Sequence, residues 1–389
     1  MKSNESARSN PVRTILIVTA GMGAGHLGAA RQLSWRLERR GYEAPMFDLL
    51  GAMRWGYGRF IAGVYRAQLR HAMWSYRAVY ALWRYRPELF ARANATNTRL
   101  ARRAVCDKVA QVRPVAIVST YNLATQVLGA LIERGDIDVP TFTFITDFGV
   151  HPYWLHDAMS GYATVHPTTA ATVRSMTSTP VAVTGPFVDP SFAPDPWRRA
   201  TTRAALGFGD DETMALVVAG AWGVGDIEAT VTDLDQAGGI TPVVVGGDHP
   251  RLVRRLRRRV SDPSHVLGFV DTMPALMDAA DVLVENAGGL TAMEAFASRL
   301  PVITYRPIPA HGTDNAHAMA AAGVTRYARD RTALAEQLEA VTTAGPDRRA
   351  LIGEARRVVR PDPASALLQI VEADRPTRAW SHSHQRQSA

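Results

Sequence analysis

Short apolar runs alternate along this chain with longer stretches in which apolar residues recur at helical spacing. In the first half, strands are expected at residues 14–19, 43–47, 115–120, 141–146, 162–165 and 181–184. In the second half, strands are expected at residues 214–219, 242–246, 264–267, 282–284 and 301–305. Because strands that alternate with helices form parallel sheets through right-handed crossovers, the pattern predicts an α/β protein with two parallel sheets.

A proline-rich segment without strand or helix periodicity separates the two halves and predicts a linker at residues 187–197. Rossmann-like domains are expected on either side of it, at residues 14–186 and 198–372. Their sheets should face each other across a cleft, with ligands beyond the carboxyl ends of the strands. The remaining boundaries are a helical insertion at 52–103, a flexible N-terminus at 1–13 and a disordered tail at 373–389.

Composition narrows the class of protein. Hydrophobic residues make up 47% of the 389 residues and charged residues 21%, as in a globular protein of two domains. Cys106 is the only cysteine, which excludes an intrachain disulfide and a cysteine-cluster metal site. No secretory signal and no apolar run of about 20 residues is visible, so a cytoplasmic location is expected. The net charge of +8 suits anionic lipid, phosphorylated ligands or nucleic acid, but no nucleic-acid-binding motif is present.

Two adjacent glycines, Gly288 and Gly289, join an apolar strand to an apolar helix in the second half. Glycine lets the backbone approach an anion closely, and the free N–H groups of a helix start favour phosphate. Leu290 and Thr291 complete this turn. Glu294, about one turn into the helix, can accept hydrogen bonds from hydroxyl groups beyond the phosphates. The turn predicts a nucleotide-sugar site, although an ordinary strand-to-helix turn has the same form.

A second glycine-rich turn lies near the N-terminus, where Gly23, Gly25 and Gly28 fit the pattern G-x-G-x-x-G. Asp48 follows at about the 20-residue spacing of a ribose-binding acid, so a dinucleotide site is one interpretation. His26 favours another, because in the first turn of the helix it would occupy the space of a pyrophosphate. The helix dipole disfavours its imidazolium, which suits a general base. A histidine that only caps the loop is the third interpretation.

Further polar and glycine positions follow other expected strands. Gly223 belongs to a turn that would approach a bound diphosphate or act as an interdomain hinge, and Gly246 belongs to a weaker turn of this kind. Asp147 and His151 follow a strand of the first half. Asp147 could orient His26 or bind a second substrate, and a structural role is equally consistent with both residues.

Together these motifs resemble those of GT-B glycosyltransferases, and more narrowly the family of monogalactosyldiacylglycerol synthases and bacterial processive diacylglycerol glucosyltransferases. The resemblance extends from about residue 14 to residue 327. The turn that ends in His26 is similar to the family's Gly-Gly-His turn, and residues 146–154 look like its Thr-Asp-x-x-x-His-x-x-Trp stretch. The resemblance implies that His26 is the catalytic base. It places Asp147 and His151 near the acceptor, and we expect all three to be catalytic.

In the second half the resemblance implies a UDP-sugar site. Residues 268–273 look like the segment against the uracil, and residues 314–316 look like the end of the second donor loop. The resemblance also implies that Glu294 binds the sugar. The expected donor-binding residues are Gly25, Gly223, Gly246, Phe269, Val270, Met273, Gly288, Gly289, Leu290, Thr291, Glu294, Asp314 and Asn315.

The chain departs from the family at two places. His311 and Gly312 stand where Gln-Glu commonly precedes the asparagine of the second donor loop. Asn286 and Ala287 replace a usual Lys-Pro, which removes one cation from the diphosphate environment. Galactose, glucose and glucuronic acid therefore all remain open as the transferred sugar. No cofactor and no metal is expected, because a helix start and backbone N–H groups can stabilise the leaving diphosphate.

The insertion at 52–103 interleaves arginine with aromatic residues, a composition typical of contact with lipid headgroups. The same composition suits single-stranded nucleic acid, and aromatic residues in a helical segment often pack in a core. Membrane contacts are expected at Arg66, Arg70, Trp74, Arg77 and Trp83.

The motifs predict an inverting, metal-independent hexosyltransferase that moves a sugar from a UDP-sugar to a lipid, with diacylglycerol as the expected acceptor, at the cytoplasmic face of the membrane. Its expected partners are the UDP-sugar, the lipid acceptor and an anionic membrane surface, without nucleic acid. The alternatives are a soluble transferase that acts on a small natural product, an NAD-dependent oxidoreductase, and a non-catalytic nucleotide-sugar-binding protein.

Overall fold

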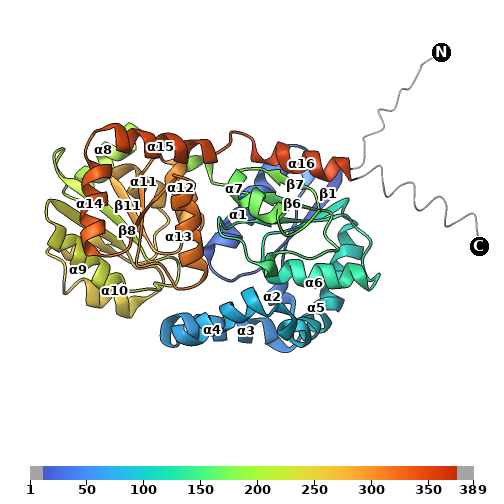
Figure 1. The fold of residues 1–389 in the computed structure, drawn as a ribbon. Coiled ribbons are helices and arrows are strands. Elements are labelled where there is room, and N and C mark those ends of the chain that lie inside the picture. Colours follow the sequence, from blue (N-terminus) through green and yellow to red (C-terminus); the bar gives the residue numbers. More distant parts are fainter. Residues whose placement is uncertain (1–11, 375–389) are drawn as a thin grey trace, which may run out of the picture.

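The apolar runs of the first half form one parallel sheet in the computed structural model, which describes residues 12–374 (Figure 1). Its seven strands are β1 (Arg13–Thr19), β2 (Tyr42–Glu43), β3 (Met46–Asp48), β4 (Ala116–Ser119), β5 (Thr141–Ile145), β6 (Gly161–Thr164) and β7 (Val181–Val183). The strand order is β2-β1-β4-β5-β6-β7, and β3 also pairs with β1. The run expected as one strand at 43–47 is divided at Pro45, because proline has no N–H to donate to a ladder.

The second half forms a separate parallel sheet of six strands. They are β8 (Thr213–Val218), β9 (Ile240–Val245), β10 (Val266–Leu267), β11 (Val282–Glu285), β12 (Val302–Tyr305) and β13 (Arg326–Ala328), in the order β10-β9-β8-β11-β12-β13. The expected α/β architecture with two parallel sheets is confirmed. Strand β13 was not among the expected strands, since its short run Arg-Tyr-Ala carries no apolar pattern.

Helices cover the faces of both sheets and bury apolar side chains against the strands. In the first domain they are α1 (Ala24–Glu38), α6 (Asn122–Glu133) and α7 (Pro167–Arg174). In the second they are α8 (Pro196–Ala205), α9 (Ile227–Ala237), α10 (Pro250–Leu256), α11 (Met273–Ala279), α12 (Leu290–Ala297), α13 (His311–Ala321), α14 (Arg331–Thr342) and α15 (Pro346–Val358).

The arginine- and aromatic-rich segment is helical. It comprises α2 (Leu49–Ala52), α3 (Tyr57–His71), α4 (Met73–Tyr85) and α5 (Ala91–Val112), with short 3-10 turns at 54–56 and 87–90. Figure 1 shows α3 and α4 lying along one side of the molecule, below both domains. The insertion therefore belongs to the first domain by sequence but reaches the second domain in space.

The last helix corrects the expected boundary at residue 372. Helix α16 (Pro363–Ala373) lies against β6, β7 and α1 of the first domain, where Arg40 pairs with Asp362 and the Tyr42 hydroxyl donates to Glu372 over 3.2 Å. The chain thus crosses between the domains twice. The crossings touch, because a Cβ on Gly185 would lie 2.7 Å from the Val358 carbonyl oxygen.

The expected chain ends fall mostly outside the described residues. This applies to residues 1–11 of the expected flexible N-terminus and to residues 375–389 of the expected tail. Within the described part, Arg13 already belongs to β1 and Ala373 to α16. Arg13, expected in the flexible N-terminus, and Ala373, expected in the disordered tail, therefore lie in regular secondary structure.

Candidate active site

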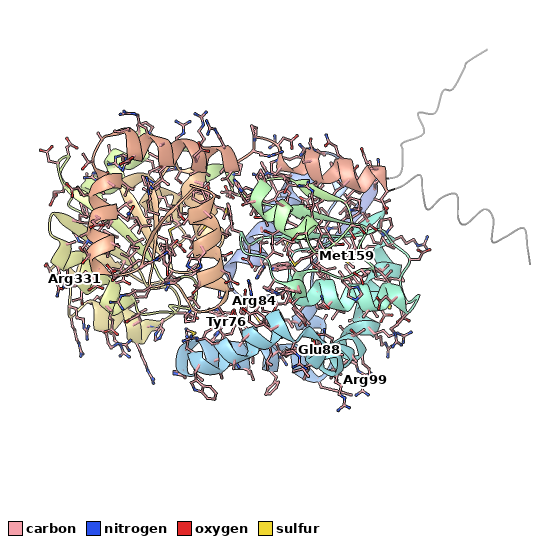
Figure 2. All side chains as sticks on the ribbon, in the orientation of Figure 1. Tyr76, Arg84, Glu88, Arg99, Met159 and Arg331 are labelled. Atoms are coloured by element: carbon pink, nitrogen blue, oxygen red, sulfur yellow. The ribbon has the colours of Figure 1, made fainter. Side chains whose placement is uncertain are left out.

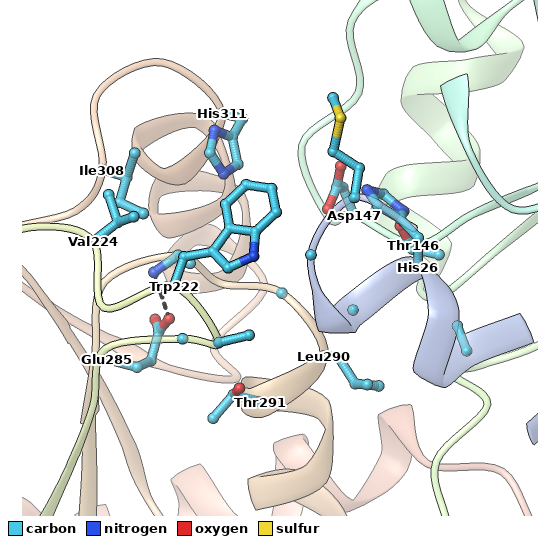
Figure 3. Close-up of a pocket in the computed structure, with 18 of the residues that line it drawn as sticks. His26, Thr146, Asp147, Trp222, Val224, Glu285, Leu290, Thr291, Ile308 and His311 are labelled. Carbon is cyan, nitrogen blue, oxygen red and sulfur yellow. Dashed lines mark hydrogen bonds between the residues drawn. The ribbon is translucent and has the colours of Figure 1, made fainter. Parts of the chain in front are cut away.

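A cavity of about 400 Å³ lies between the carboxyl ends of the two sheets. Both glycine-rich turns open onto it, and so does the inner side of the helical insertion. Figure 3 shows His26, Thr146 and Asp147 on one side of the cavity, with Trp222, Glu285, Leu290 and His311 on the other. The first domain and the second domain therefore contribute opposite walls of one site.

His26 occupies the first turn of α1, as expected, after Gly23 with a φ of 81°. Its Nδ1 lies 3.0 Å from the Thr120 carbonyl oxygen and 3.1 Å from the Thr146 hydroxyl. Since a carbonyl oxygen only accepts, Nδ1 carries the proton and Nε2 keeps its lone pair. Burial lowers the pKa of His26, while the charge of Asp147 and the hydrogen bond to Thr120 oppose that shift. The residue is therefore held as a neutral base.

Asp147 lines the cavity beside His26. Thr120 and Thr146, and not Asp147, are the hydrogen-bond partners of Nδ1 of His26. Asp147 acts on His26 through its charge, which raises the pKa of the imidazole. The sequence did not point to Thr120, because its contribution is a backbone carbonyl that any residue could provide.

Glu285 stabilises the turn after β11 through hydrogen bonds to its carboxylate. One carboxylate oxygen accepts from the N–H groups of Ala287 over 2.7 Å and Gly288 over 2.5 Å. The other accepts from the Thr304 hydroxyl over 2.6 Å. The N–H of Gly288 is thus already bonded, contrary to the expectation that it binds diphosphate.

The free donors begin at the next residues. Leu290 and Thr291 open α12, so their N–H groups have no intrahelical acceptor. Gly289, Leu290 and Thr291 all line the cavity. The anion-binding part of the turn therefore starts two residues later than the sequence indicated, at Leu290, the first residue of the helix.

Glu294 also lines the cavity from α12. Burial, followed by the charge of Asp189, raises the pKa of Glu294 to about 8. The side chain is therefore protonated near neutral pH. A protonated or ionised carboxyl can bond to sugar hydroxyls in either form.

The expected donor residues of the last loop are bonded within the protein. The Asp314 carboxylate accepts from the Tyr80 hydroxyl and from Arg84, each over 2.7 Å. The Asn315 amide donates to the Ala287 carbonyl oxygen over 3.1 Å and accepts from the Gly149 N–H over 2.8 Å. These side chains connect the two domains, so direct donor binding by Asp314 and Asn315 is not what the geometry supports.

The other expected donor positions divide between the cavity wall and the layer behind it. Phe269, Val270 and Met273 line the cavity, and the Phe269 side chain is 66% exposed, which leaves its ring free to stack on a base. Gly223 and Gly246 lie behind the wall, because a Cβ on Gly223 would be 2.6 Å from the Gly246 carbonyl oxygen. Their neighbours in the same turns, Gly220 and Gly247, are the ones that line the cavity.

The dinucleotide interpretation of the first turn does not fit the structure. Gly25 lines the cavity, but a Cβ on Gly28 would lie 2.4 Å from the Leu290 side chain of the other domain. Asp48 accepts from the Gly21 N–H over 3.1 Å and caps α2 at Leu50. The space for a pyrophosphate is filled, and the expected ribose-binding acid holds the loop.

His151 is buried in an aromatic wall of the cavity. Its ring stacks near Trp83, which in turn lies parallel to Tyr153 at 5.1 Å. Burial lowers the pKa of His151 to about 3, so the ring is neutral. Trp83 lines the cavity, and the expectation that it contacts a membrane is wrong.

The two sides of α3 and α4 differ in character. On the inner side, Arg70 donates to the carbonyl oxygens of Trp222 over 2.9 Å and Asp248 over 3.0 Å, and Arg66 lies over the Trp222 ring. Arg70 is therefore bonded to the second domain and is not available to lipid. Seven large apolar residues are exposed on α3, α4 and the two adjoining 3-10 turns, which are Trp55, Phe60, Val64, Trp74, Leu82, Tyr85 and Leu89. We call these seven the outer apolar face; Arg54, Arg59 and the expected contact Arg77 are exposed on the same helices and the turn before them.

Within residues 12–374, no group of three or more histidine, cysteine or acidic side chains is arranged to hold a metal ion. Over the same range, none of the helices combines the length and the apolar content that a membrane crossing requires.

Two family models match the chain along most of its length. Residues 26–188 match the monogalactosyldiacylglycerol (MGDG) synthase model, and residues 224–344 match the model of glycosyl transferases group 1. A processive diacylglycerol beta-glucosyltransferase of Bacillus mycoides is 24% identical over 374 residues, which are 92% of this chain and 93% of the relative. The corresponding protein of Bacillus cereus strain G9842 is 22% identical over 92% of this chain and 93% of its own length.

Solved structures share the fold. MurG of Acinetobacter baumannii superposes with a TM-score of 0.57 at 15% identity, over 94% of this chain and 99% of its own. A UGT transferase of Siraitia grosvenorii in complex with UDP superposes with a TM-score of 0.61 at 13% identity, over 93% and 100%. The chain is thus a glycosyltransferase with the GT-B fold, whose first domain matches the monogalactosyldiacylglycerol synthase family and whose second domain matches glycosyl transferases group 1.

Proposed function

We propose that this protein transfers a hexose from a UDP-sugar to diacylglycerol with inversion at the anomeric carbon. The observation that carries the proposal is the pair of opposed groups in one cavity. The lone pair of His26 Nε2 lies on one wall, and the free N–H groups at the start of α12 lie on the other. One wall can deprotonate a hydroxyl while the other stabilises a leaving diphosphate.

The reaction is a displacement. His26 takes the proton of the acceptor hydroxyl, whose oxygen forms a bond to the anomeric carbon on the face opposite the diphosphate. The bond between that carbon and the β-phosphate oxygen breaks, and its electron pair stays on UDP. The N–H groups of Leu290 and Thr291 and the dipole of α12 stabilise this charge.

A neutral hexose is favoured over a uronic acid as the transferred sugar. Asp147 lines the cavity, and a sugar carboxylate beside it would meet like charge and lose hydration. Glucose is the first choice, because the relatives that match over 92% of the chain are named glucosyltransferases. Galactose is the second choice, from the family model of the first domain.

A lipid acceptor agrees with the outer apolar face of α3 and α4. Aromatic residues flanked by arginine bind the headgroup region of anionic membranes, and helices of this kind lie in the interface. The same two helices form one wall of the cavity with Tyr65, Tyr76 and Tyr80. Seating them on the cytoplasmic face of a membrane would bring a lipid hydroxyl towards His26 without removing the acyl chains from the bilayer.

The test is direct transfer. Purified protein is incubated with radiolabelled UDP-glucose, UDP-galactose or UDP-glucuronic acid and with vesicles that contain diacylglycerol, and lipid products are separated by thin-layer chromatography. Labelled monoglycosyl lipid of inverted configuration is expected with a neutral hexose. Transfer to a soluble aglycone in the absence of vesicles would favour the alternative, a transferase for small natural products.

A further inference from the structure

His311 is the one imidazole on the donor side of the described cavity wall, and it stands where the family commonly has another residue type. It opens α13, directly after Ala310, whose φ of 75° is rare for a residue with a side chain. Figure 3 shows its ring at the cavity, beside Trp222 and across from Asp147. The backbone N–H groups of His311 and Gly312 lack intrahelical acceptors, as at any helix start.

His311 lies at the reacting end of the cavity. Its pKa is lowered by burial, raised by the charge of Asp147, lowered by His26 and raised by Asp314. The interactions with Asp147 and His26 place it near the base, and it follows β12, whereas Phe269 follows β10 at the edge of the same sheet. A donor whose anomeric carbon faces His26 would have its β-phosphate, rather than its α-phosphate, beside this ring.

In this cavity the negative charge of a diphosphate would be stabilised by neutral hydrogen-bond donors and not by cationic side chains. Among the described residues that line the cavity there is no lysine and no arginine, whereas Asp147, Glu285 and Glu294 are acidic. The helix starts of α12 and α13 supply N–H groups. A neutral imidazole N–H at the start of α13 is a further side-chain donor on this wall.

The Tyr76 hydroxyl lies 2.7 Å from Nδ1 of His311 and comes from the helical insertion of the other domain. Figure 2 places Tyr76 where α4 faces the body of the molecule. Burial raises the pKa of Tyr76 well above its ordinary value, so the hydroxyl keeps its proton. When this proton is donated to Nδ1, the imidazole carries its own proton on Nε2.

We propose that His311 donates a hydrogen bond from Nε2 to the β-phosphate of the donor and of the departing UDP, and that Tyr76 positions it by fixing this tautomer. The opposite tautomer would direct a lone pair at an anionic oxygen and is disfavoured by the ligand itself. No proton is transferred to the phosphate; the imidazole remains neutral throughout. This inference rests on the proposed use of a UDP-sugar.

A consequence is that the acceptor half of the protein tunes the donor site. Tyr76 belongs to the same helix as the exposed Trp74 and two residues that line the cavity, Tyr80 and Trp83. Any displacement of α4 that breaks the bond from Tyr76 removes the preference for the donating tautomer. Affinity for the diphosphate then falls although no group that touches it has been replaced.

The test compares UDP with UMP, which lacks the β-phosphate, by titration calorimetry. His311→Ala is expected to weaken UDP about 10- to 100-fold, as for the loss of a hydrogen bond to a charged group, and to leave UMP unchanged. His311→Gln, which keeps an amide N–H, should restore part of the UDP affinity. His317→Ala, on the exposed side of the same helix, is the matched control and should bind both nucleotides like the wild type.

Tyr76→Phe should weaken UDP by a smaller factor and again spare UMP, while the exposed Tyr85→Phe on the same helix should change neither. The double variant Tyr76→Phe/His311→Ala should bind UDP no more weakly than His311→Ala alone, because a positioning residue has nothing left to position. Additive losses would show that Tyr76 acts independently and would overturn its role.

The proposal about His311 is overturned if His311→Ala weakens UDP-sugar but not UDP, because the ring would then contact the sugar. It is also overturned if UMP and UDP weaken equally. Unchanged binding of UMP shows that each variant is folded. Wild-type protein that binds neither nucleotide would instead contradict the proposed function itself.

Discussion

The two glycine-rich turns face each other across one cavity, yet they present different parts of the chain to it. In the first turn, Gly23 leads into a helix whose first turn offers a side chain, His26. In the second, Gly288 with a φ of 64° leads into a helix that offers backbone N–H groups at Leu290 and Thr291. The same strand-turn-helix arrangement thus supports proton transfer in the first domain and charge stabilisation in the second.

The supporting residues differ in the same way. The first turn is completed by groups from its own sheet, the Thr120 carbonyl and the Thr146 hydroxyl, which set the tautomer of His26. The second is completed by Glu285, which bonds the N–H groups before the helix and leaves those at its start free. The role of each turn therefore follows from the group that it leaves without a hydrogen-bond partner: the Nε2 lone pair of His26 in the first turn and the backbone N–H groups of α12 in the second.

The variant His26→Ala should separate the role of the first turn in catalysis from the role of the second turn in binding UDP. Loss of a general base should lower kcat by roughly 10²–10⁴-fold, while UDP affinity stays near that of the wild type because the diphosphate is bound on the opposite wall. Transfer assays with diacylglycerol vesicles and UDP calorimetry measure the two quantities. Wild-type turnover in this variant would remove His26 from the mechanism.

The pH dependence should follow His26 as well. Burial lowers its pKa from the ordinary value of 6.5, and only the neutral ring accepts a proton. As pH falls, kcat/KM should stay level through 6.5 and decline only below it, by up to tenfold per pH unit. His26→Ala should lack this decline, and a decline centred above 6.5 would assign it to another group.

On the second turn, Glu294→Ala should weaken the UDP-sugar by about 0.5–1.5 kcal/mol, the value of a hydrogen bond between neutral groups, and should weaken UDP much less. The pKa of about 8 means that the carboxyl is protonated at neutral pH. Glu294→Gln, a neutral isostere, should therefore retain more affinity than Glu294→Ala. Equal losses for both ligands in calorimetry would indicate a structural role.

Membrane binding is expected to depend on the helical insertion of the first domain. Replacement of Arg54, Arg59 and Arg77 by Glu should reduce co-sedimentation with anionic vesicles, since each arginine near the surface contributes about 1 kcal/mol at low salt. Trp74→Ala should remove part of the binding that resists high salt. The same charge change at Arg331, Arg349 and Arg356, which are exposed on α14 and α15, is the control. Wild-type protein that ignores anionic vesicles would favour the soluble transferase.

The smallest expected effect is that of chelation. If backbone N–H groups stabilise the leaving diphosphate, exhaustive dialysis against EDTA should leave kcat unchanged. A strict requirement for magnesium or manganese, restored on addition of the ion, would show that the second turn does not carry this charge alone.

The strands and the two turns were predictable because each depends on a local pattern. Apolar runs mark the strands, and glycine between a strand and a helix marks the loops around His26 and Gly288. Such patterns state where an element lies. They do not state which side of a helix faces a ligand, a core or a membrane.

The errors follow from that limit. Trp83, Arg70 and Trp74 come from one arginine- and aromatic-rich pattern, yet Trp83 lines the cavity, Arg70 bonds the second domain and only Trp74 is 76% exposed. Asp314 and Asn315 match a donor motif but bond across the domains. The partners of Arg70, Asp314 and Asn315 in the other domain lie more than a hundred residues away, so no local pattern identifies them.

The two touching crossings between the domains define how the molecule can move. Two chain segments in contact at Gly185 and Val358 allow rotation about the line they form but oppose twisting and sliding. Figure 1 places this line on the side of α15 and α16, opposite α3 and α4. A rotation that admits or releases a nucleotide therefore displaces the insertion side most. Such a rotation would strain the bonds that join the insertion to the second domain, from Tyr80 and Arg84 to Asp314 and from Arg70 to Trp222.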